Sequence, residues 1–234
     1  MDAVSELRHA GGRNDRPSLA RSLVAEGLGT AYLLIAIVGS GILGERLAAG
    51  NIALALLANA LSTGAALYAL IVWLAPLSGA HFNPLISLVL AFRGDIAPRV
   101  AGLYVPAQLA GAIAGVAIAD AIFDMPLYAL SSHLRSGHSQ WLSEFLITFG
   151  LIGMVWTCSR VRPSALAGAV AAYIGAGFWF TATDFANPAV ALARAFTNTF
   201  SGIRPIDVPG FLIAEMLGAV AAVALFRWLV PSLR

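Results

Sequence analysis

Six blocks of apolar sequence, each at least 19 residues long, constrain the fold of this chain more than any other feature. A helix of about 20 apolar residues is long enough to cross a hydrocarbon core of about 30 Å. The composition agrees, because 59% of the residues are hydrophobic and only 11% are charged, whereas soluble domains are about half apolar and about a quarter charged. The sequence therefore predicts an all-α membrane protein with six transmembrane helices, at approximately residues 22–44, 50–75, 99–123, 140–158, 164–182 and 208–230.

The arginines divide unevenly between the two sides of these spans. The polar N-terminal arm (residues 1–20) is too polar, and the block after it too long, for a cleaved signal peptide. With this arm in the cytosol, ten arginines fall on the cytoplasmic side and four on the other. An excess of Lys and Arg marks cytoplasmic loops. We therefore expect both termini in the cytosol and a single membrane domain over residues 21–234.

The two halves of the chain resemble each other. The segment NPLISLVLAF (83–92) matches NPAVALARAF (187–196) at five of ten positions, and AEGLGTAYLL (25–34) resembles SEFLITFGLI (143–152). Each half, about 21–123 and about 139–230, holds three spans. Because three is odd, the halves must be inverted relative to each other, as in many transport proteins.

Each half also carries an Asn-Pro pair inside apolar sequence. Proline is favourable at the first position of a helix, and asparagine is a preferred N-cap. We expect short helices to begin at Pro84 and Pro188. About ten residues give about 15 Å of helix, so two such half-helices from opposite faces would meet at the bilayer midplane. A single Asn-Pro would more often be a loop turn, but two copies at equivalent places favour half-helices.

Such an arrangement implies a pore. Irregular backbone at membrane depth is tolerated only when it is buried in protein or lines a water-filled cavity. The loops before Asn83 and Asn187 would expose carbonyl acceptors, and both helix N-termini would place positive potential at the centre. The Asn83 and Asn187 amides can donate to a passing oxygen. The pattern therefore favours passage of small neutral molecules that carry oxygen, with cations excluded.

These segments resemble the aquaporin (major intrinsic protein) family. SGAHFNPLISL is similar to that family's first Asn-Pro-Ala loop, with Leu85 in place of the usual Ala, and FANPAVALAR is similar to the second. The resemblance covers almost the whole chain and implies a single channel domain and a homotetramer of independently conducting protomers. It also implies a pore centre at Asn83, Pro84, Leu85, Asn187, Pro188 and Ala189, with loop support from Glu26, Glu144, Gln108 and Glu215. His81 is either a structural histidine or a pore-lining imidazole.

The resemblance also assigns a selectivity filter, at which the chain departs from the family pattern. The Arg that usually follows Asn-Pro-Ala is Val190 here. The other filter positions fall at Thr63, Gly175 and Asp184, or at Phe185 if the alignment slips by one. Small residues at Thr63 and Gly175 predict a wider constriction than in a strict water channel.

Two charged residues near this filter need separate interpretation. For Asp184 we favour a structural role, such as capping a turn or pairing with an arginine, over a bare carboxylate in the constriction. Arg194 lies seven residues beyond Asn187, or about two helical turns. We therefore expect it in a vestibule or as an interfacial anchor, and not at the constriction.

The second loop, FANPAVALARAFTNTFSGI (185–203), resembles bacterial channels associated with arsenic resistance, in which Val also follows Asn-Pro-Ala. That resemblance implies arsenous acid as a substrate, a small neutral triol similar in shape to glycerol, besides glycerol-like polyols and water, and a bacterial inner membrane. The lone Cys158 is expected away from the pore. The alternatives are a mainly water-selective pore, if Leu85 or Phe185 narrows it, a coupled secondary transporter, and a structural or sensor protein with a closed pore. No nucleophile–base pair or metal-ligand spacing indicates an enzyme, a metal site or a cofactor, and no basic cluster indicates nucleic acid.

Overall fold

The computed structural model describes residues 17–230, and the predicted cytosolic arm lies mostly outside this range. Within it the chain is helical, and the six predicted spans are confirmed. The long helices are α2 (Leu19–Leu47), α3 (Ile52–Ser78), α5 (Pro98–Ile122), α6 (His138–Val161), α7 (Pro163–Phe180) and α9 (Val208–Leu229).

Local sequence signals set the ends of these helices. Asn51 caps α3, since its side-chain oxygen accepts a hydrogen bond from the Leu54 N–H, as N-cap asparagines commonly do. Gly79 ends α3 with a left-handed backbone (φ 92°), a conformation that glycine adopts without steric cost. Pro98 and Pro163 open α5 and α7 at the first helical position, where the missing N–H has no partner to lose.

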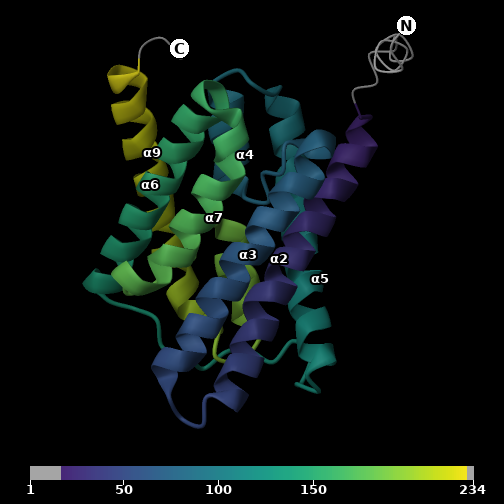
Figure 1. Cartoon of the computed structure of the whole chain (residues 1–234), viewed down its shortest axis with the longest axis vertical. Helices are drawn as coiled ribbons and strands as arrows, with labels where there is room; N and C mark the ends of the chain where they lie inside the picture. The colour runs from purple at the N-terminus through teal and green to yellow at the C-terminus, as the bar shows by residue number, and fades with distance from the viewer. Residues whose placement is uncertain (1–16, 231–234) are drawn as a thin grey trace, which may run out of the picture.

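The helices form two inverted three-span units. In the first, α2 packs against α3 and α5, and in the second, α6 packs against α7 and α9. The contact between α3 and α7 joins the two units. Helix α2 begins and α9 ends at the same end of the bundle (Figure 1), which we call the terminal face. We call the opposite end the distal face.

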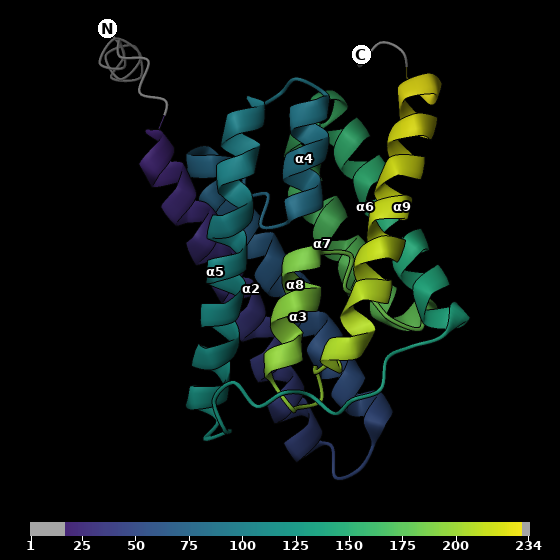
Figure 2. The same cartoon turned by 180° about the vertical axis from the view of Figure 1, so that it is seen from behind.

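Two half-helices fill the space between these units. Helix α4 (Pro84–Phe92) and helix α8 (Pro188–Ala193) start at the predicted prolines. They start near mid-height and run apart, α4 towards the terminal face and α8 towards the distal face (Figure 2). Helix α8 is shorter than the expected ten residues, because its α-helical part ends after six residues and continues as a 3-10 turn (η1, Arg194–Phe196). A second 3-10 turn (η2, Pro205–Asp207) leads into α9.

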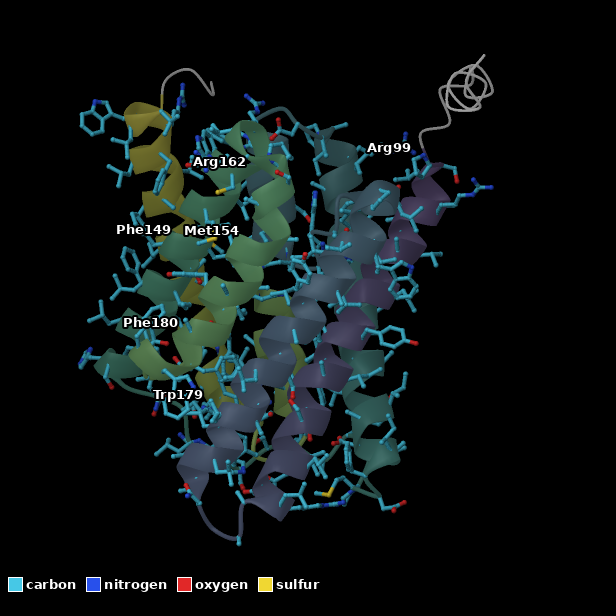
Figure 3. All side chains as sticks on the ribbon, in the orientation of Figure 1. Arg99, Phe149, Met154, Arg162, Trp179 and Phe180 are labelled. Atoms are coloured by element: carbon cyan, nitrogen blue, oxygen red, sulfur yellow. The ribbon has the colours of Figure 1, made fainter. Side chains whose placement is uncertain are left out.

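The outer surface of the bundle is apolar and aromatic. Trp179 and Phe180 project from the distal end of α7, whereas Arg99 and Arg162 lie near the terminal face (Figure 3). The side chains of Trp179 and Phe180 are more than half exposed. Aromatic residues near the ends of a span are typical of contact with the membrane–water boundary.

Candidate functional site

The first turns of the two half-helices are bonded to each other. Asn83 and Asn187 are the N-caps of α4 and α8, and their side-chain oxygens accept from the N–H groups of Leu85 and Ala189 at 2.9 and 3.0 Å. Each amide nitrogen then reaches across to the other loop. The Asn83 amide donates to the Ala186 carbonyl, and the Asn187 amide donates to the Phe82 carbonyl, both at 2.8 Å.

The carbonyls that accept these bonds belong to residues with left-handed backbone. Phe82 and Ala186, each directly before its Asn-Pro, both have φ 49°. Non-glycine residues rarely adopt this conformation, which costs about 1–3 kcal/mol and persists only when the surroundings enforce it. The identical geometry in both loops shows that the strain belongs to the architecture of the repeat.

Glu26 of α2 enforces this conformation in the first loop. Its carboxylate accepts the His81 N–H at 2.9 Å and the Phe82 N–H at 2.7 Å, and it also accepts the Gln108 side-chain amide at 2.8 Å. Glu26 and Gln108 are fully buried. Since a buried carboxylate must have partners, this network fixes the loop where it passes the centre of the bundle.

Glu144 of α6 has the same role in the second loop. It accepts the Phe185 N–H at 3.1 Å and the Ala186 N–H at 2.9 Å, while Glu215 of α9 accepts the Asn187 N–H at 3.2 Å. Both glutamates are fully buried. All four residues predicted to support the loops, Glu26, Gln108, Glu144 and Glu215, therefore contact the loops or each other.

His81 is both a structural histidine and a residue that lines the cavity, which were the two interpretations left open by the sequence. Its Nδ1 lies 2.9 Å from the Ser87 hydroxyl, and its ring packs edge-on against Tyr104 at 5.2 Å between centroids. The Gln108 amide donates to the same Ser87 oxygen. His81 also lines the cavity described next, so it is held by structural contacts on one side and faces open space on the other.

Two cavities lie on one path through the bundle. The inner cavity, of about 330 Å³, extends from Arg93 and Arg160 at the terminal face past His81, Asn83 and Asn187. The distal vestibule, of about 460 Å³, is lined by residues of α2, α3 and the distal loops. Four residues line both cavities, and we call this boundary the neck: Phe178, Asp184, Phe185 and Arg194.

Not all of the residues predicted for the selectivity filter line the inner cavity. Thr63, Val190, Asp184 and Phe185 line the inner cavity, so both alternatives, Asp184 and Phe185, reach the neck. Gly175 lines neither cavity. It packs on α3, where an added Cβ would lie 3.5 Å from the Ala60 carbonyl oxygen.

Other residues on the same elements also line the cavity, although no sequence pattern predicted them. Ile174 and Phe178 of α7 line it on either side of Gly175 in the sequence. In the first half-helix, Ile86 lines the cavity, whereas Leu85 is buried and does not. Leu85 therefore does not narrow the lumen.

The Asp184 carboxylate turns away from the open space. Its oxygens are buried and have no hydrogen-bond partner in residues 17–230. They lie against Gly177, where an added Cβ would overlap Oδ2. The side chain packs between α6 and α7, in agreement with the structural role expected for Asp184, although it makes neither a turn cap nor an ion pair within residues 17–230.

Arg194 also differs from expectation. Its side chain is only 5% exposed, so it is not an interfacial anchor. The guanidinium carbon lies 3.5 Å from the centre of the Phe185 ring, and Nε donates to the Ser201 carbonyl. Arg194 does line the distal vestibule, one of the two places expected for it, but it also lines the inner cavity and so reaches the neck, because its side chain folds back towards Phe185.

Comparison with known proteins shows which family the chain belongs to. The sequence model of the major intrinsic proteins matches residues 14–184. The chain belongs to the major intrinsic protein family. As members of this family are passive channels, the chain is a channel for water and small solutes and not an enzyme.

Individual major intrinsic proteins resemble the chain to different degrees. Aquaglyceroporin AqpS of Rhizobium meliloti (strain 1021) is 55% identical over 217 residues, which cover 92% of this chain and 93% of the relative. Human Aquaporin-5 is 32% identical over 185 residues, covering 73% and 68%. The X-ray structure of the aquaglyceroporin from Plasmodium falciparum matches 92% of this chain and 99% of its own with a TM-score of 0.70, at 20% sequence identity, which supports the fold.

Proposed function

We propose that the chain is a passive channel for small uncharged solutes with several hydroxyl groups, chiefly arsenous acid and glycerol-like polyols, as well as water. The observation that carries this proposal is that Val190, the residue directly after Asn-Pro-Ala, lines the inner cavity. A valine there leaves the lumen without the bulk and the charge of the usual arginine.

The polar groups along the cavity suit such solutes. The Thr63 hydroxyl is buried and has no hydrogen-bond partner within the described chain, although buried polar groups are normally satisfied. Each of Asn83 and Asn187 has two amide hydrogens and uses one in the bond between the loops. The second hydrogen of each is available to a solute oxygen, while Ile86, Leu90 and Ile174 supply apolar wall.

One curated relative supports the same substrate class. AqpS, 55% identical over most of both chains, is named an aquaglyceroporin. Arsenous acid and glycerol are both small neutral triols, so a lumen that passes one is of the right size and polarity for the other. We further propose that the chain forms a homotetramer in a bacterial inner membrane. We place the terminal face in the cytosol, because most arginines of the described chain lie at that face.

A mainly water-selective pore is the second candidate. The neck favours it, because two phenylalanines, Phe178 and Phe185, lie at the boundary between the cavities. Narrow aromatic walls would pass water faster than triols.

Flux into proteoliposomes separates the two candidates. We expect the purified chain to pass water, glycerol and arsenous acid without saturation, and Val190→Arg to lower the two triol fluxes at least tenfold more than water flux. The control is Val72→Arg, an exposed valine on the outer face of α3. Water flux without triol flux in the unmodified chain would favour the water pore, and equal losses in Val190→Arg would show that Val190 does not select.

A further inference from the structure

We propose that Arg194 supplies the fixed positive charge and the N–H donors of this channel's constriction, from one helical turn beyond the position that the family normally uses. The proposal rests on the proposed function in one respect, namely that Val190 forms pore wall. It assigns cation exclusion, which that function requires, to a residue outside the Asn-Pro-Ala-Val segment.

The helix geometry brings Arg194 into register with Val190. Residues four apart lie on the same face of a helix, and α8 with its 3-10 continuation spans Pro188–Phe196. Side chains on helices point back towards the N-terminus, which in α8 is the centre of the pore. A long side chain at position 194 therefore covers the distal side of Val190, and both residues line the inner cavity.

The guanidinium is fixed at the neck. It stacks on Phe185 with 3.5 Å between Cζ and the ring centre, and Nε donates to the Ser201 carbonyl. Stacking on an aromatic ring stabilises a cation. A guanidinium carries five N–H donors, and its other four make no hydrogen bond to residues 17–230. Those donors are free for a solute oxygen at the boundary between the cavities.

The neighbouring charges leave the neck positive. Arg135 lines the distal vestibule, and its guanidinium carbon lies 5.5 Å from the centre of the same Phe185 ring. The Glu144 carboxylate is committed to the N–H groups of Phe185 and Ala186. Asp184 is the acidic residue of the neck, and its oxygens turn towards Gly177. A permeating ion passes Glu45 and Arg135 in the distal vestibule before it reaches Arg194 at the neck, where the guanidinium repels a cation.

This placement separates two properties that one arginine provides elsewhere in the family. Steric width is set at Val190, where the lumen stays open to a triol. The positive charge lies one helical turn away, on the guanidinium of Arg194. There a neutral solute can accept hydrogen bonds from the N–H groups, whereas a cation is repelled. A wide channel can therefore still exclude cations.

Cation leakage from proteoliposomes tests the assignment. Vesicles with the full chain, loaded with potassium and a pH-sensitive dye, report K⁺ and proton flux, and light scattering reports water flux. We expect Arg194→Met to raise cation flux at least tenfold with water flux retained, and Arg194→Lys to stay near the unmodified chain. Val190→Arg in the Arg194→Met background should restore exclusion. The matched control is Arg204→Met, a distal-face arginine that lines neither cavity and pairs with Asp207.

The outcomes decide the proposal independently of the solute. Unchanged cation flux in Arg194→Met, or an equal leak in Arg194→Lys and Arg194→Met, would overturn it. If Arg194→Met cannot be reconstituted, Arg194→Gln gives the same readout and keeps a donor for the Ser201 carbonyl. A channel that passes no triol but leaks cations in Arg194→Met would refute the proposed substrates and support Arg194 as the excluding charge.

Discussion

Asn83 and Asn187 bond the two half-helices to each other, each amide donating at 2.8 Å to the carbonyl that precedes the other asparagine. Both accepting carbonyls belong to residues with left-handed backbone, Phe82 and Ala186. The two loops thus hold each other's strained conformation. Because each side-chain oxygen is also occupied as an N-cap, the asparagines are fixed in orientation before any solute arrives.

Replacing either asparagine with aspartate should isolate the bond between the loops. Asn83→Asp keeps an oxygen for the Leu85 N–H but removes the donor to Ala186 and places two acceptors face to face. We expect a loss of about 1–3 kcal/mol in the free energy of unfolding, measured by denaturant titration in mixed micelles, with lower water flux. Asn51→Asp, at the equally good N-cap of α3, should be neutral, and equal losses in both would show that the bond contributes nothing.

Glu26→Gln tests the support of the first loop. Glu26 accepts three hydrogen bonds. Glutamine has a single acceptor oxygen, and its own NH₂ group would face the N–H donors that the carboxylate now accepts from. The expected cost is about 1.5–3 kcal/mol for each bond lost to a charged group, read from the same titration. Glu45→Gln, at the exposed distal end of the same helix, should leave the unfolding midpoint in place. A midpoint in Glu26→Gln that matched Glu45→Gln would mean that water or a shifted backbone replaces these bonds.

Much of the fold follows from local sequence signals. Apolar length predicted the spans, so that the expected block 22–44 became helix Leu19–Leu47. Cap chemistry predicted the starts of both half-helices at Pro84 and Pro188. These features depend on residues close in the sequence, and for this reason they can be predicted without tertiary contacts.

The constriction could not be derived in the same way. Counting residues along an ideal helix placed Arg194 two turns out, and the backbone does continue helically to that position, but the long side chain returns over Phe185. The i, i+4 spacing between Val190 and Arg194 was a usable signal, since it places both on one face. Which way Gly175 and Asp184 face depends on how α7 packs against α3 and α6, and no sequence pattern specifies that rotation.

Gly111→Ala and Gly102→Ala form a matched pair on α5. A Cβ at Gly111 would overlap the Gly27 carbonyl of α2, while nothing lies within 4 Å of a Cβ at Gly102. We expect Gly111→Ala to destabilise the protein by about 1–3 kcal/mol through overpacking, and Gly102→Ala to stabilise it by up to about 1 kcal/mol because alanine favours helix. Thermal unfolding in detergent compares them, and equal shifts would show that α2 and α5 separate without cost.

The terminal face should lose stability in acid through Asp95, which lies between α4 and α5, outside the spans. Burial raises the pKa of this carboxyl, but hydrogen bonds from Arg160 and Arg93 outweigh burial and hold its pKa below the usual value. A carboxyl with a lowered folded-state pKa stabilises the fold fully above its unfolded pKa of about 3.9, and this contribution is lost as the pH falls through the folded-state pKa. We therefore expect Asp95→Asn to be less stable than the unmodified chain at pH 6, with the difference closing below about pH 4. The measurement is the unfolding midpoint against pH, with Asp124→Asn in the exposed distal loop as the control. A difference that stayed constant down to acidic pH would show that the ion pairs of Asp95 add nothing to stability.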